Sequence, residues 1–207
     1  MESVAHAIES LDKLADSKPV ATLAARFAAE GFELALVGGP VRDAFLGRKV
    51  TDLDFATNAN PDDIMRLVKP ISDVQWDIGR DFGTIAARID GETVEITTYR
   101  ADSYDGETRK PVVAFGDSLE KDLERRDFSV NAMALRLPER VLVDPWGGVE
   151  HLLSKTITTP GSPEVSFGDD PLRMMRAARF TSQLGFTVSP TTVAAMKQLA
   201  PQLDIVS

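Results

Sequence analysis

Two periodicities distinguish the elements in the first part of the chain. Apolar residues spaced along one helical face predict a helix at 20–30, which ends at Gly31. Short apolar or alternating runs are typical of strands, and the Asp90-Gly91 turn signal predicts antiparallel pairing around it. These patterns predict strands at 33–38, 52–57, 74–78, 84–90 and 93–99, and helices at 40–46 and 61–69.

The second part of the chain changes from strands to helices. Residues 101–117 are polar and interrupted by glycine and proline, which predicts a mobile loop. Residues 118–135 are predicted to be largely helical, and VLVD at 141–144 to be a short strand. Beyond about Pro160 only helices are expected, at roughly 169–184 and 190–200. We therefore expect an α/β (α+β) domain with a mixed or antiparallel sheet and flanking helices, followed by an all-α segment.

The composition is that of an ordinary soluble globular protein. Of the 207 residues, 43% are hydrophobic and 27% are charged. No apolar run approaches the length of about 20 residues that a membrane helix needs. The N-terminus is acidic and lacks the basic start and apolar core of a signal peptide, so a cytoplasmic location is expected.

Several kinds of site are excluded by composition. The chain has no cysteine, so disulfides and thiolate metal sites are impossible, and two histidines leave little room for zinc or a Ser-His-Asp arrangement. The net charge of -9 argues against nucleic-acid binding by bulk electrostatics. A polyanionic partner must be held by local basic groups, or by protein that is missing from this chain.

Three carboxylates on predicted strands are the first candidate site. Asp52 and Asp54 are two residues apart and share one face of a strand, while Leu53 and Phe55 face the core. Glu95 occupies a similar position on its own strand. Like charges repel unless a cation lies between them, and Mg²⁺ prefers such oxygen ligands. The pattern fits a two-metal site for displacement at phosphorus, although a solvated acidic strand face remains an alternative.

The Gly38-Gly39-Pro40 bend is the second candidate site. Glycines let the backbone approach a ligand, and proline is accommodated in the first turn of a helix. Arg42 lies one turn further on and can add a cation. The bend predicts a phosphate-binding element next to the carboxylates, although a tight strand-to-helix turn alone would explain the glycines.

Six motifs, in their order and spacing, resemble a known enzyme family. They are GGPVRD, DLDFAT, VEITTYR, RRDFSVNAMA, DPWGG and DDPLRMMRAARF, and the match runs from about residue 20 to the last residue. The chain is similar to the bacterial tRNA nucleotidyltransferase and poly(A) polymerase family, class II of the polymerase-beta-like nucleotidyltransferase superfamily. The resemblance implies an N-terminal helical extension at 1–19, a catalytic nucleotidyltransferase head at 20–155 and the start of a helical neck at 156–207.

The resemblance also implies roles for individual residues. Asp52 and Asp54 are expected to bind catalytic Mg²⁺, with Glu95 near the attacking 3′-hydroxyl. The loop at 101–117 is expected to take part in switching from C to A addition. The remaining residues are expected to contact the nucleotide, its sugar or its phosphates: Gly38, Gly39, Arg42, Arg126, Asp127, Asn131, Arg176 and Arg179. An ordinary charged helix start is the alternative for the group at 126–131.

Asp170 and Arg173 can be interpreted physically as a base-selecting pair. They are three residues apart, so on a helix they lie side by side. An aspartate accepts from an exocyclic amine and an arginine donates to a ring acceptor, an order that cytosine and adenine match and uracil and guanine do not. The alternative is that Asp170 caps the helix before Pro171 and that Arg173 is a solvated side chain.

Two departures from the family pattern qualify this interpretation. The family commonly has glutamate where this chain has Asp169, which weakens inference about that residue alone. The chain also stops at LDIVS, where family members continue into the rest of the neck, a body and a tail. We therefore expect a head-and-neck fragment, which would explain an acidic chain in a nucleic-acid enzyme family.

The predicted function is template-independent addition of nucleotides from CTP and ATP to the 3′ end of tRNA. The RNA 3′-hydroxyl is expected to attack the α-phosphate in line, with two metal ions assisting and pyrophosphate leaving. The alternatives are addition from ATP only, by a poly(A) polymerase or A-adding enzyme, and a nucleotide-binding fragment without turnover. A dinucleotide-binding dehydrogenase does not fit, because the G-x-G-x-x-G fingerprint is missing. The oligomeric state stays open.

Overall fold

A seven-stranded mixed sheet forms the centre of the molecule. The computed structural model describes residues 4–77, 79–100, 116 and 118–205. In the described residues the strand order is β3-β4-β5-β2-β1-β6-β7, and a separate pair joins β8 and β9. The strands are β1 (Leu34–Val37), β2 (Leu53–Thr57), β3 (Val74–Trp76), β4 (Thr84–Ile89), β5 (Glu92–Thr98), β6 (Ala134–Leu137), β7 (Val141–Val143), β8 (Thr156–Ile157) and β9 (Thr187–Val188).

Pairing within the large sheet is antiparallel except between β2 and β5. Those two strands run parallel, and their register places Asp54 opposite Glu95. The β4–β5 hairpin turns at Asp90 and Gly91, whose φ angles of 50° and 83° match the two positive values of a type I′ turn. The predicted antiparallel hairpin and the predicted mixed sheet are therefore confirmed.

Helices cover both faces of the sheet. The elements are α1 (Val4–Asp16), α2 (Lys18–Ala29), α3 (Gly39–Phe45), α4 (Pro61–Val68), α5 (Leu119–Glu124), α6 (Gly148–Leu153), α7 (Pro163–Asp169), α8 (Leu172–Leu184) and α9 (Pro190–Leu199). Short 3₁₀ turns are η1 (Lys69–Ile71), η2 (Arg80–Phe82), η3 (Ser129–Asn131) and η4 (Ala200–Ile205). None of the helices in the described part of the chain is long and apolar enough to cross a membrane.

Alternation along the strands separates two apolar clusters. Leu53 and Phe55 of β2 belong to the larger cluster, which α1 to α4 cover and which continues into α7, α8 and α9. Ala56 of β2 belongs to a smaller cluster on the opposite face, where Leu119 and Leu123 of α5 pack. Asp54 lies between Leu53 and Phe55 and therefore shares the face that α5 covers only in part.

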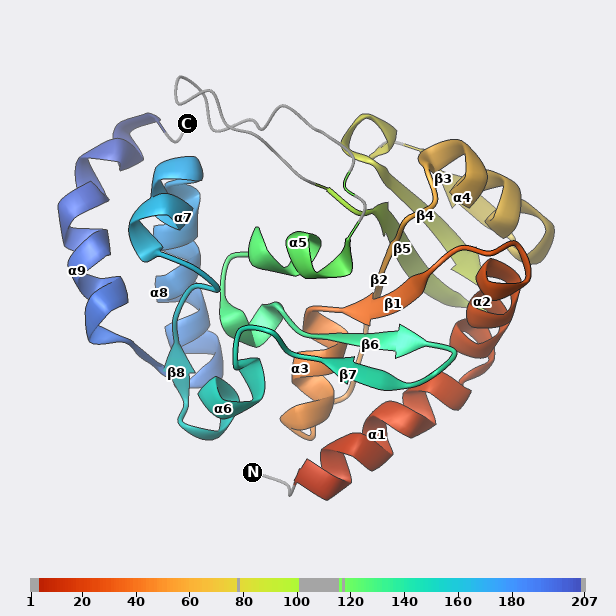
Figure 1. The fold of residues 1–207 in the computed structure, drawn as a ribbon, viewed down its shortest axis with the longest axis horizontal. Helices are drawn as coiled ribbons and strands as arrows, with labels where there is room; N and C mark the ends of the chain where they lie inside the picture. Colours follow the sequence, from red (N-terminus) through yellow and green to blue (C-terminus); the bar gives the residue numbers. More distant parts are fainter. Residues whose placement is uncertain (1–3, 78, 101–115, 117, 206–207) are drawn as a thin grey trace.

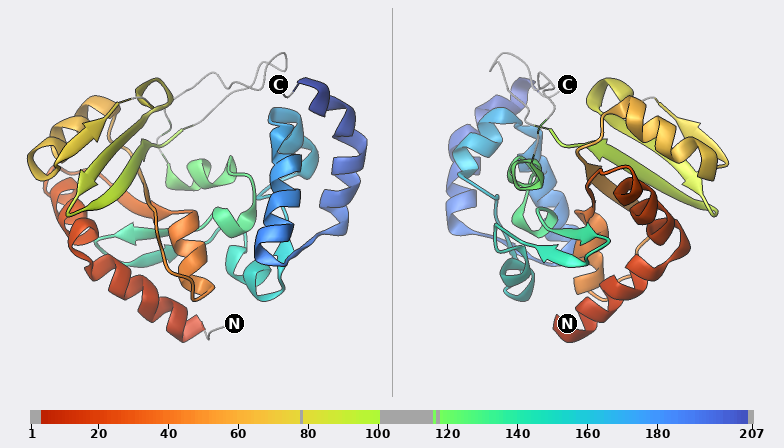
Figure 2. Two further views of the ribbon diagram at one scale, coloured as in Figure 1. Left: turned by 180° about the vertical axis from the view of Figure 1, so that it is seen from behind. Right: turned by 45° about the vertical axis from the view of Figure 1, so that its right-hand side comes forward.

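The C-terminal helices gather at the end of the molecule opposite β3, β4 and β5 (Figures 1 and 2). Phe180 of α8 packs edge-to-face on Phe128, with ring centroids 5.7 Å apart. This contact joins α8 to the segment that follows α5. Residues of that segment therefore lie between the sheet and the C-terminal helices, and these residues line the site described below.

Some predicted elements are wrong. The helix expected at 118–135 ends at Glu124, because Ala134–Leu137 forms strand β6, which pairs with β1. Helix α8 begins at Leu172 and not near Asp169, since α7 ends there and Pro171 lies at the break. The C-terminal segment expected to be purely helical also contains β9. The predicted loop at 101–117 lies outside the described residues except for Gly116, and the predicted domain boundaries stay a prediction.

Candidate active site

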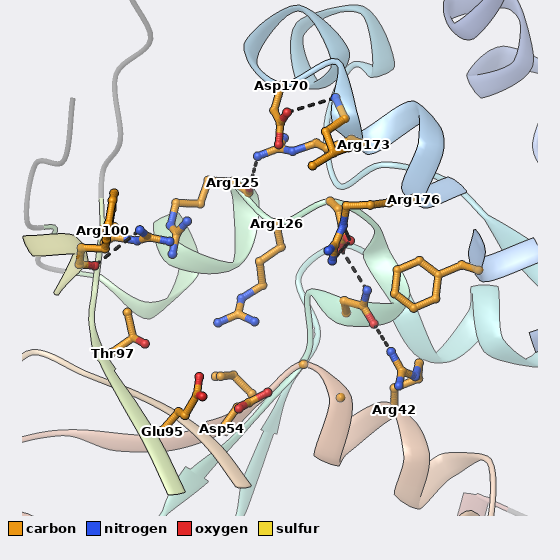
Figure 3. Close-up of a pocket in the computed structure, with 18 of the residues that line it drawn as sticks. Arg42, Asp54, Glu95, Thr97, Arg100, Arg125, Arg126, Asp170, Arg173 and Arg176 are labelled. Carbon is orange, nitrogen blue, oxygen red and sulfur yellow. Dashed lines mark hydrogen bonds and ion pairs between the residues drawn. The ribbon is translucent and has the colours of Figure 1, made fainter. Parts of the chain in front are cut away.

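A cleft of about 630 Å³ lies between the sheet and α8. The carboxyl end of β1, the first half of β2, the start of α3, strand β5, the segment after α5 and the start of α8 all contribute to its wall (Figure 3). Eleven of the thirteen predicted site residues line it: Gly38, Gly39, Arg42, Asp54, Glu95, Arg126, Asp127, Asn131, Asp170, Arg173 and Arg176. Segments far apart in the sequence therefore meet in one place, as predicted. Asp52 and Arg179 are not in the wall of the cleft.

Asp54 and Glu95 form the acidic centre of the cleft. They are register partners on the parallel strands β2 and β5, and both side chains point into the cleft in Figure 3. Burial raises the pKa of Asp54 to about 6, and the charge of Glu95 adds to that rise, while Arg126 acts against it. A carboxylate beside a second carboxylate in a partly buried place is suited to hold a cation.

Asp52 does not line the cleft, although it was predicted to bind metal together with Asp54. It precedes the first residue of β2 and is exposed, with Thr51 Oγ1 donating to its Oδ2 at 3.2 Å. Its charge nevertheless contributes to the raised pKa of Asp54, so the two carboxylates influence each other. Among the described residues no group of three or more acidic or histidine side chains is arranged to hold a metal. The oxygen donors of Asp54 and Glu95 fit Mg²⁺, which often takes only one or two protein carboxylates.

Gly38 shapes the bend between β1 and α3. Its φ of 70° and ψ of -119° belong to a region that residues with a side chain rarely adopt. A Cβ at this position would lie 3.0 Å from Nη1 of Arg126. Glycine therefore allows the Arg126 guanidinium to lie against the bend, and both groups face the same part of the cleft.

A chain of hydrogen bonds runs from α3 to α8 along the cleft. Arg42 Nη1 donates to Asn131 Oδ1 at 2.7 Å, and Asn131 Nδ2 donates to Asp127 Oδ1 at 2.9 Å. Arg176 donates to Asp127 Oδ2 from Nε at 2.8 Å and from Nη2 at 2.5 Å. The backbone N–H of Phe128 also donates to Asp127 Oδ1. Both carboxylate oxygens of Asp127 are thus engaged by protein groups, and this residue positions its neighbours.

Phe180 is surrounded by three predicted site arginines. The guanidinium carbons of Arg42, Arg176 and Arg179 lie 5.5, 5.7 and 5.2 Å from the centre of its ring. A cation over an aromatic face is attracted by the ring quadrupole. The three arginines at positions 42, 176 and 179 could not be related to one ring without the fold.

Asp122 is a site-supporting residue that the sequence analysis missed. Its side chain is only 1% exposed and accepts from Arg125 Nη2 and Arg126 Nη2, both at 3.0 Å. Burial tends to raise the pKa of Asp122, but the charges of Arg126 and Arg125 hold it below its ordinary value. The spacing of three and four residues on a helix was a readable signal for both ion pairs. Only the fold reveals that the carboxylate is buried.

Arg126 lines the cleft and contains one donor without a described partner. Its Nε is buried and finds no hydrogen-bond partner among the described residues, while its Nη2 is held by Asp122. A buried donor without a partner is costly, and the charge of the guanidinium is only partly offset by Asp122. The arrangement of Arg126 next to Gly38 and Arg42 therefore favours an anionic ligand at this end of the cleft.

Asp170 and Arg173 both line the cleft, but they do not form an ion pair in the described structure. Asp170 Oδ1 accepts from the backbone N–H of Leu172, the first residue of α8, at 3.0 Å, although Pro171 is the N-cap residue of that helix. Arg173 is 8% exposed, and its guanidinium donates to Ser166 Oγ at 2.8 Å and to the carbonyl of Arg125 at 2.6 Å. The alternative of a solvated Arg173 is therefore wrong.

A model of the poly A polymerase head domain matches residues 34–158, which is more than half of the chain. The chain belongs to this family. The head-domain match contains Asp54, Glu95, Arg126 and Asp127, whereas Asp170, Arg173 and Arg176 lie beyond it. The cleft is therefore built by the head domain together with the helices that follow it.

Relatives of this head-domain protein include named enzymes. The CCA-adding enzyme of Geobacillus kaustophilus (strain HTA426) is 44% identical over 179 residues, which cover 86% of this chain and 43% of that protein. The crystal structure of Bacillus stearothermophilus CCA-adding enzyme in complex with CTP is 38% identical, with a TM-score of 0.80 over 92% of this chain and 46% of that one. The crystal structure of a tRNA nucleotidyltransferase complexed with a primer tRNA and an incoming ATP analog is 32% identical, with a TM-score of 0.70 over 87% of this chain and 50% of that one. The chain spans half or less of the length of these relatives.

Proposed function

We propose that this chain carries the catalytic part of an enzyme that transfers nucleotides from CTP and ATP to the 3′ end of tRNA. The observation that carries the proposal is the arrangement of Asp54 and Glu95 opposite the Arg42 and Arg126 end of a single cleft. A triphosphate needs cations for its phosphates and carboxylates near the reacting phosphorus, and the cleft offers both. The named CCA-adding relatives support this choice of reaction.

The arginines are proposed to bind the triphosphate. Arg126 has the unsatisfied Nε, and Arg42 is fixed by Asn131 and by the ring of Phe180. Preorganised donors stabilise developing negative charge without reorganising during the reaction. We assign the β- and γ-phosphates to this end of the cleft, beside Gly38, so that the leaving pyrophosphate stays bound as the new bond forms.

The carboxylates are proposed to hold the reacting centre. Asp54 and Glu95, assisted by Asp52, are the residues that would hold Mg²⁺, which when bound supplies charge neutralisation at the α-phosphate. Glu95 is exposed within the cleft and is positioned to accept a hydrogen bond from the RNA 3′-hydroxyl. In the reaction the hydroxyl oxygen forms a bond to the α-phosphorus, its proton is released, and the bond to the bridging oxygen of pyrophosphate breaks.

Asp170 and Arg173 are proposed to select the base. Asp170 keeps its second oxygen for an exocyclic amine, since Leu172 engages Oδ1. Arg173 has five N–H donors, and the described contacts to Ser166 and Arg125 use those of Nη1 and one of Nη2. Nε–H and one Nη2–H thus lie outside the described contacts and can serve a ring acceptor. Because the guanidinium of Arg173 is anchored, its remaining donors would be held in fixed positions relative to the ring acceptor of cytosine or adenine.

Thermal stabilisation by each of CTP, ATP, UTP and GTP with Mg²⁺ tests the proposal. A ligand at about 100 times its dissociation constant raises the free energy of unfolding by about 2.7 kcal/mol. For a chain of this size the melting temperature would then rise by about 5–10 °C. We expect that rise for CTP and ATP and little change for UTP and GTP, with Asp54→Asn weakening the response.

The other outcomes separate the alternatives. A response to ATP alone would favour an A-adding or poly(A) enzyme, and an equal response to all four nucleotides would refute base selection by Asp170 and Arg173. Incorporation of labelled nucleotide into a minihelix RNA then tests turnover. Nucleotide binding without incorporation would identify a binding module, and no response to any nucleotide would refute the proposed function.

A further inference from the structure

The DPWGG motif at 144–148 does not line the cleft, and no role in the site has been given to it so far. It forms the turn that leads into α6. Both carboxylate oxygens of Asp144 accept from backbone N–H groups of that helix, from Gly148 at 2.6 Å and from Val149 at 3.0 Å. Gly147 has a φ of 65°, which glycine adopts without strain. The motif therefore fixes where α6 begins.

The start of α6 packs closely against η3. A Cβ on Gly148 would overlap the carbonyl oxygen of Ser129 and would lie 2.6 Å from Cγ of Met133. Ser129 and Met133 are both completely buried, so neither can move aside into solvent. Glycine at position 148 allows this close approach of the two backbones. The position of η3 is therefore set in part by α6.

His151 of α6 adds a polar contact to the same interface. Its Nδ1 and the hydroxyl oxygen of Ser129 share a hydrogen bond of 2.9 Å. The backbone N–H of Ser129 donates to the carbonyl of Thr158 at 2.9 Å, so Ser129 is held by two different segments. His151 is half-buried, whereas Ser129 is completely buried. Because a buried hydroxyl without a partner is costly, the hydrogen bond favours one placement of η3.

Two contacts connect η3 and the residues after it to the Arg42 end of the cleft. Asn131, the last residue of η3, accepts from Arg42 at 2.7 Å. Two residues further along the chain, the carbonyl of Met133 accepts from the backbone N–H of Gly38 at 3.1 Å. His151 itself does not line the cleft, so it can influence a ligand there only through η3.

We propose that His151 is a positioning residue for the triphosphate end of the cleft. Through Ser129 it keeps η3 in the arrangement that fixes Arg42 and the Gly38 bend. Without this hydrogen bond η3 would take further arrangements, and the apparent affinity for a phosphate ligand would fall with the fraction of molecules that stay competent to bind. This inference rests on the proposed function, because it assumes that phosphates bind beside Arg42.

Two substitutions of His151 separate its hydrogen bond from the space that its ring fills. His151→Phe keeps a flat ring but has no nitrogen, whereas His151→Asn loses the ring and places an amide atom as far along the side chain as Nδ1. That amide can donate to or accept from the hydroxyl of Ser129. Calorimetric titration with CTP and with pyrophosphate, each with Mg²⁺, is the measurement. We expect His151→Phe to weaken both affinities by about 5-fold and His151→Asn to stay within about 2-fold of the unaltered chain.

Ser129→Ala shows whether His151 acts through the serine hydroxyl. With the hydroxyl removed, His151→Phe should cause no further loss of CTP affinity, because residues that act through one contact are not additive. His6→Phe is the matched control for the change of side chain. His6 is exposed on α1 and does not line the cleft, so we expect its replacement to leave both affinities unchanged.

The outcomes distinguish this inference from the proposed function. Loss of affinity in His151→Asn with retention in His151→Phe would show that the ring acts by packing alone, and would overturn the inference. Equal affinities in all three proteins, even with a lowered melting temperature, would overturn it as well, as would additive effects of the substitutions at 129 and 151. In each of these cases the unaltered chain still binds CTP and the proposed function stands. Failure of the unaltered chain to bind either CTP or pyrophosphate would instead refute the proposed function, and this inference with it.

Discussion

Replacing Asp122 by asparagine removes a buried charge without changing the shape of the side chain. The carboxylate is 1% exposed and accepts hydrogen bonds from Arg125 and Arg126, and from the backbone N–H of Arg100 at 3.3 Å. An asparagine amide cannot satisfy both guanidinium groups, because one half of it is itself a donor. We therefore expect Asp122→Asn to destabilise the protein and to loosen Arg126 in the cleft.

The size of the effect follows from the burial of the partners. Breaking a buried ion pair by removing one partner costs about 3–5 kcal/mol. Arg125 and Arg126 keep 20% and 22% of their side chains exposed, so water can solvate part of their charge after the substitution. We expect the lower end of that range, about 3 kcal/mol. This corresponds to a fall of about 6–12 °C in the melting temperature.

The dependence on pH tests the electrostatic origin of this effect. Because the folded pKa of Asp122 lies below its ordinary value, its contribution to stability is full above about pH 4. The contribution is lost as the pH falls through the lower pKa of the folded state. Urea unfolding at a series of pH values should therefore show a constant difference between the two proteins near neutrality, which shrinks in acid.

Asp16→Asn provides the control for Asp122→Asn. Asp16 also pairs with an arginine, Arg140, but its side chain is 66% exposed, so its loss should change stability far less. A cost for Asp122→Asn below about 1 kcal/mol would refute the reasoning about the buried pair. A difference that stays constant down to pH 3 would show that the loss comes from packing and not from the charge.

Three further predictions concern the cleft. In buffer free of divalent ions, Asp54→Asn should stabilise the protein above pH 6 by about 1–2 kcal/mol after allowance for solvent screening. The reason is that the raised pKa of about 6 makes the ionised carboxylate unfavourable, and the gain should vanish toward pH 4. Phe180→Leu should weaken CTP binding by about 5-fold, because the cation–π contacts to its ring are lost. Phe128→Leu also removes a buried ring, but no arginine is described to stack on it. CTP binding by Phe128→Leu should therefore stay closer to normal. Calorimetric titration of both variants decides this, and equal losses would contradict it. Arg173→Ala should weaken binding of CTP and ATP while largely retaining that of pyrophosphate, and equal loss of both would identify Arg173 as a phosphate ligand.

Local patterns in the sequence were sufficient to predict much of the sheet and its carboxylates. Alternation along β2 and β5 placed Asp54 and Glu95 on the face opposite the core, because strand side chains point alternately to the two faces. The same rule failed for Asp52, since β2 begins one residue later and the pleat does not fix the direction of its side chain. The limits of a strand depend on which neighbours pair with it, and that information is not local.

Long-range contacts explain the remaining errors. The residues at 118–135 include many helix formers, but the last of them pair with β1 and become a strand. The environment of Arg173 was also not predictable, because its partners are a carbonyl 48 residues away and Ser166 of another helix.

The register between the parallel strands β2 and β5 places Asp54 opposite Glu95, and burial of their apolar neighbours fixes that register. Val94 and Ile96, the residues on either side of Glu95, are completely buried. A slip of one residue along β2 would turn both of them outward and bury Glu95, at a large cost in apolar surface. The two carboxylates are therefore preorganised by the interior of the protein before any ligand arrives. A polar substitution at Val94 should consequently misalign Asp54 and Glu95 in the cleft, even though the side chain at position 94 does not line the cleft.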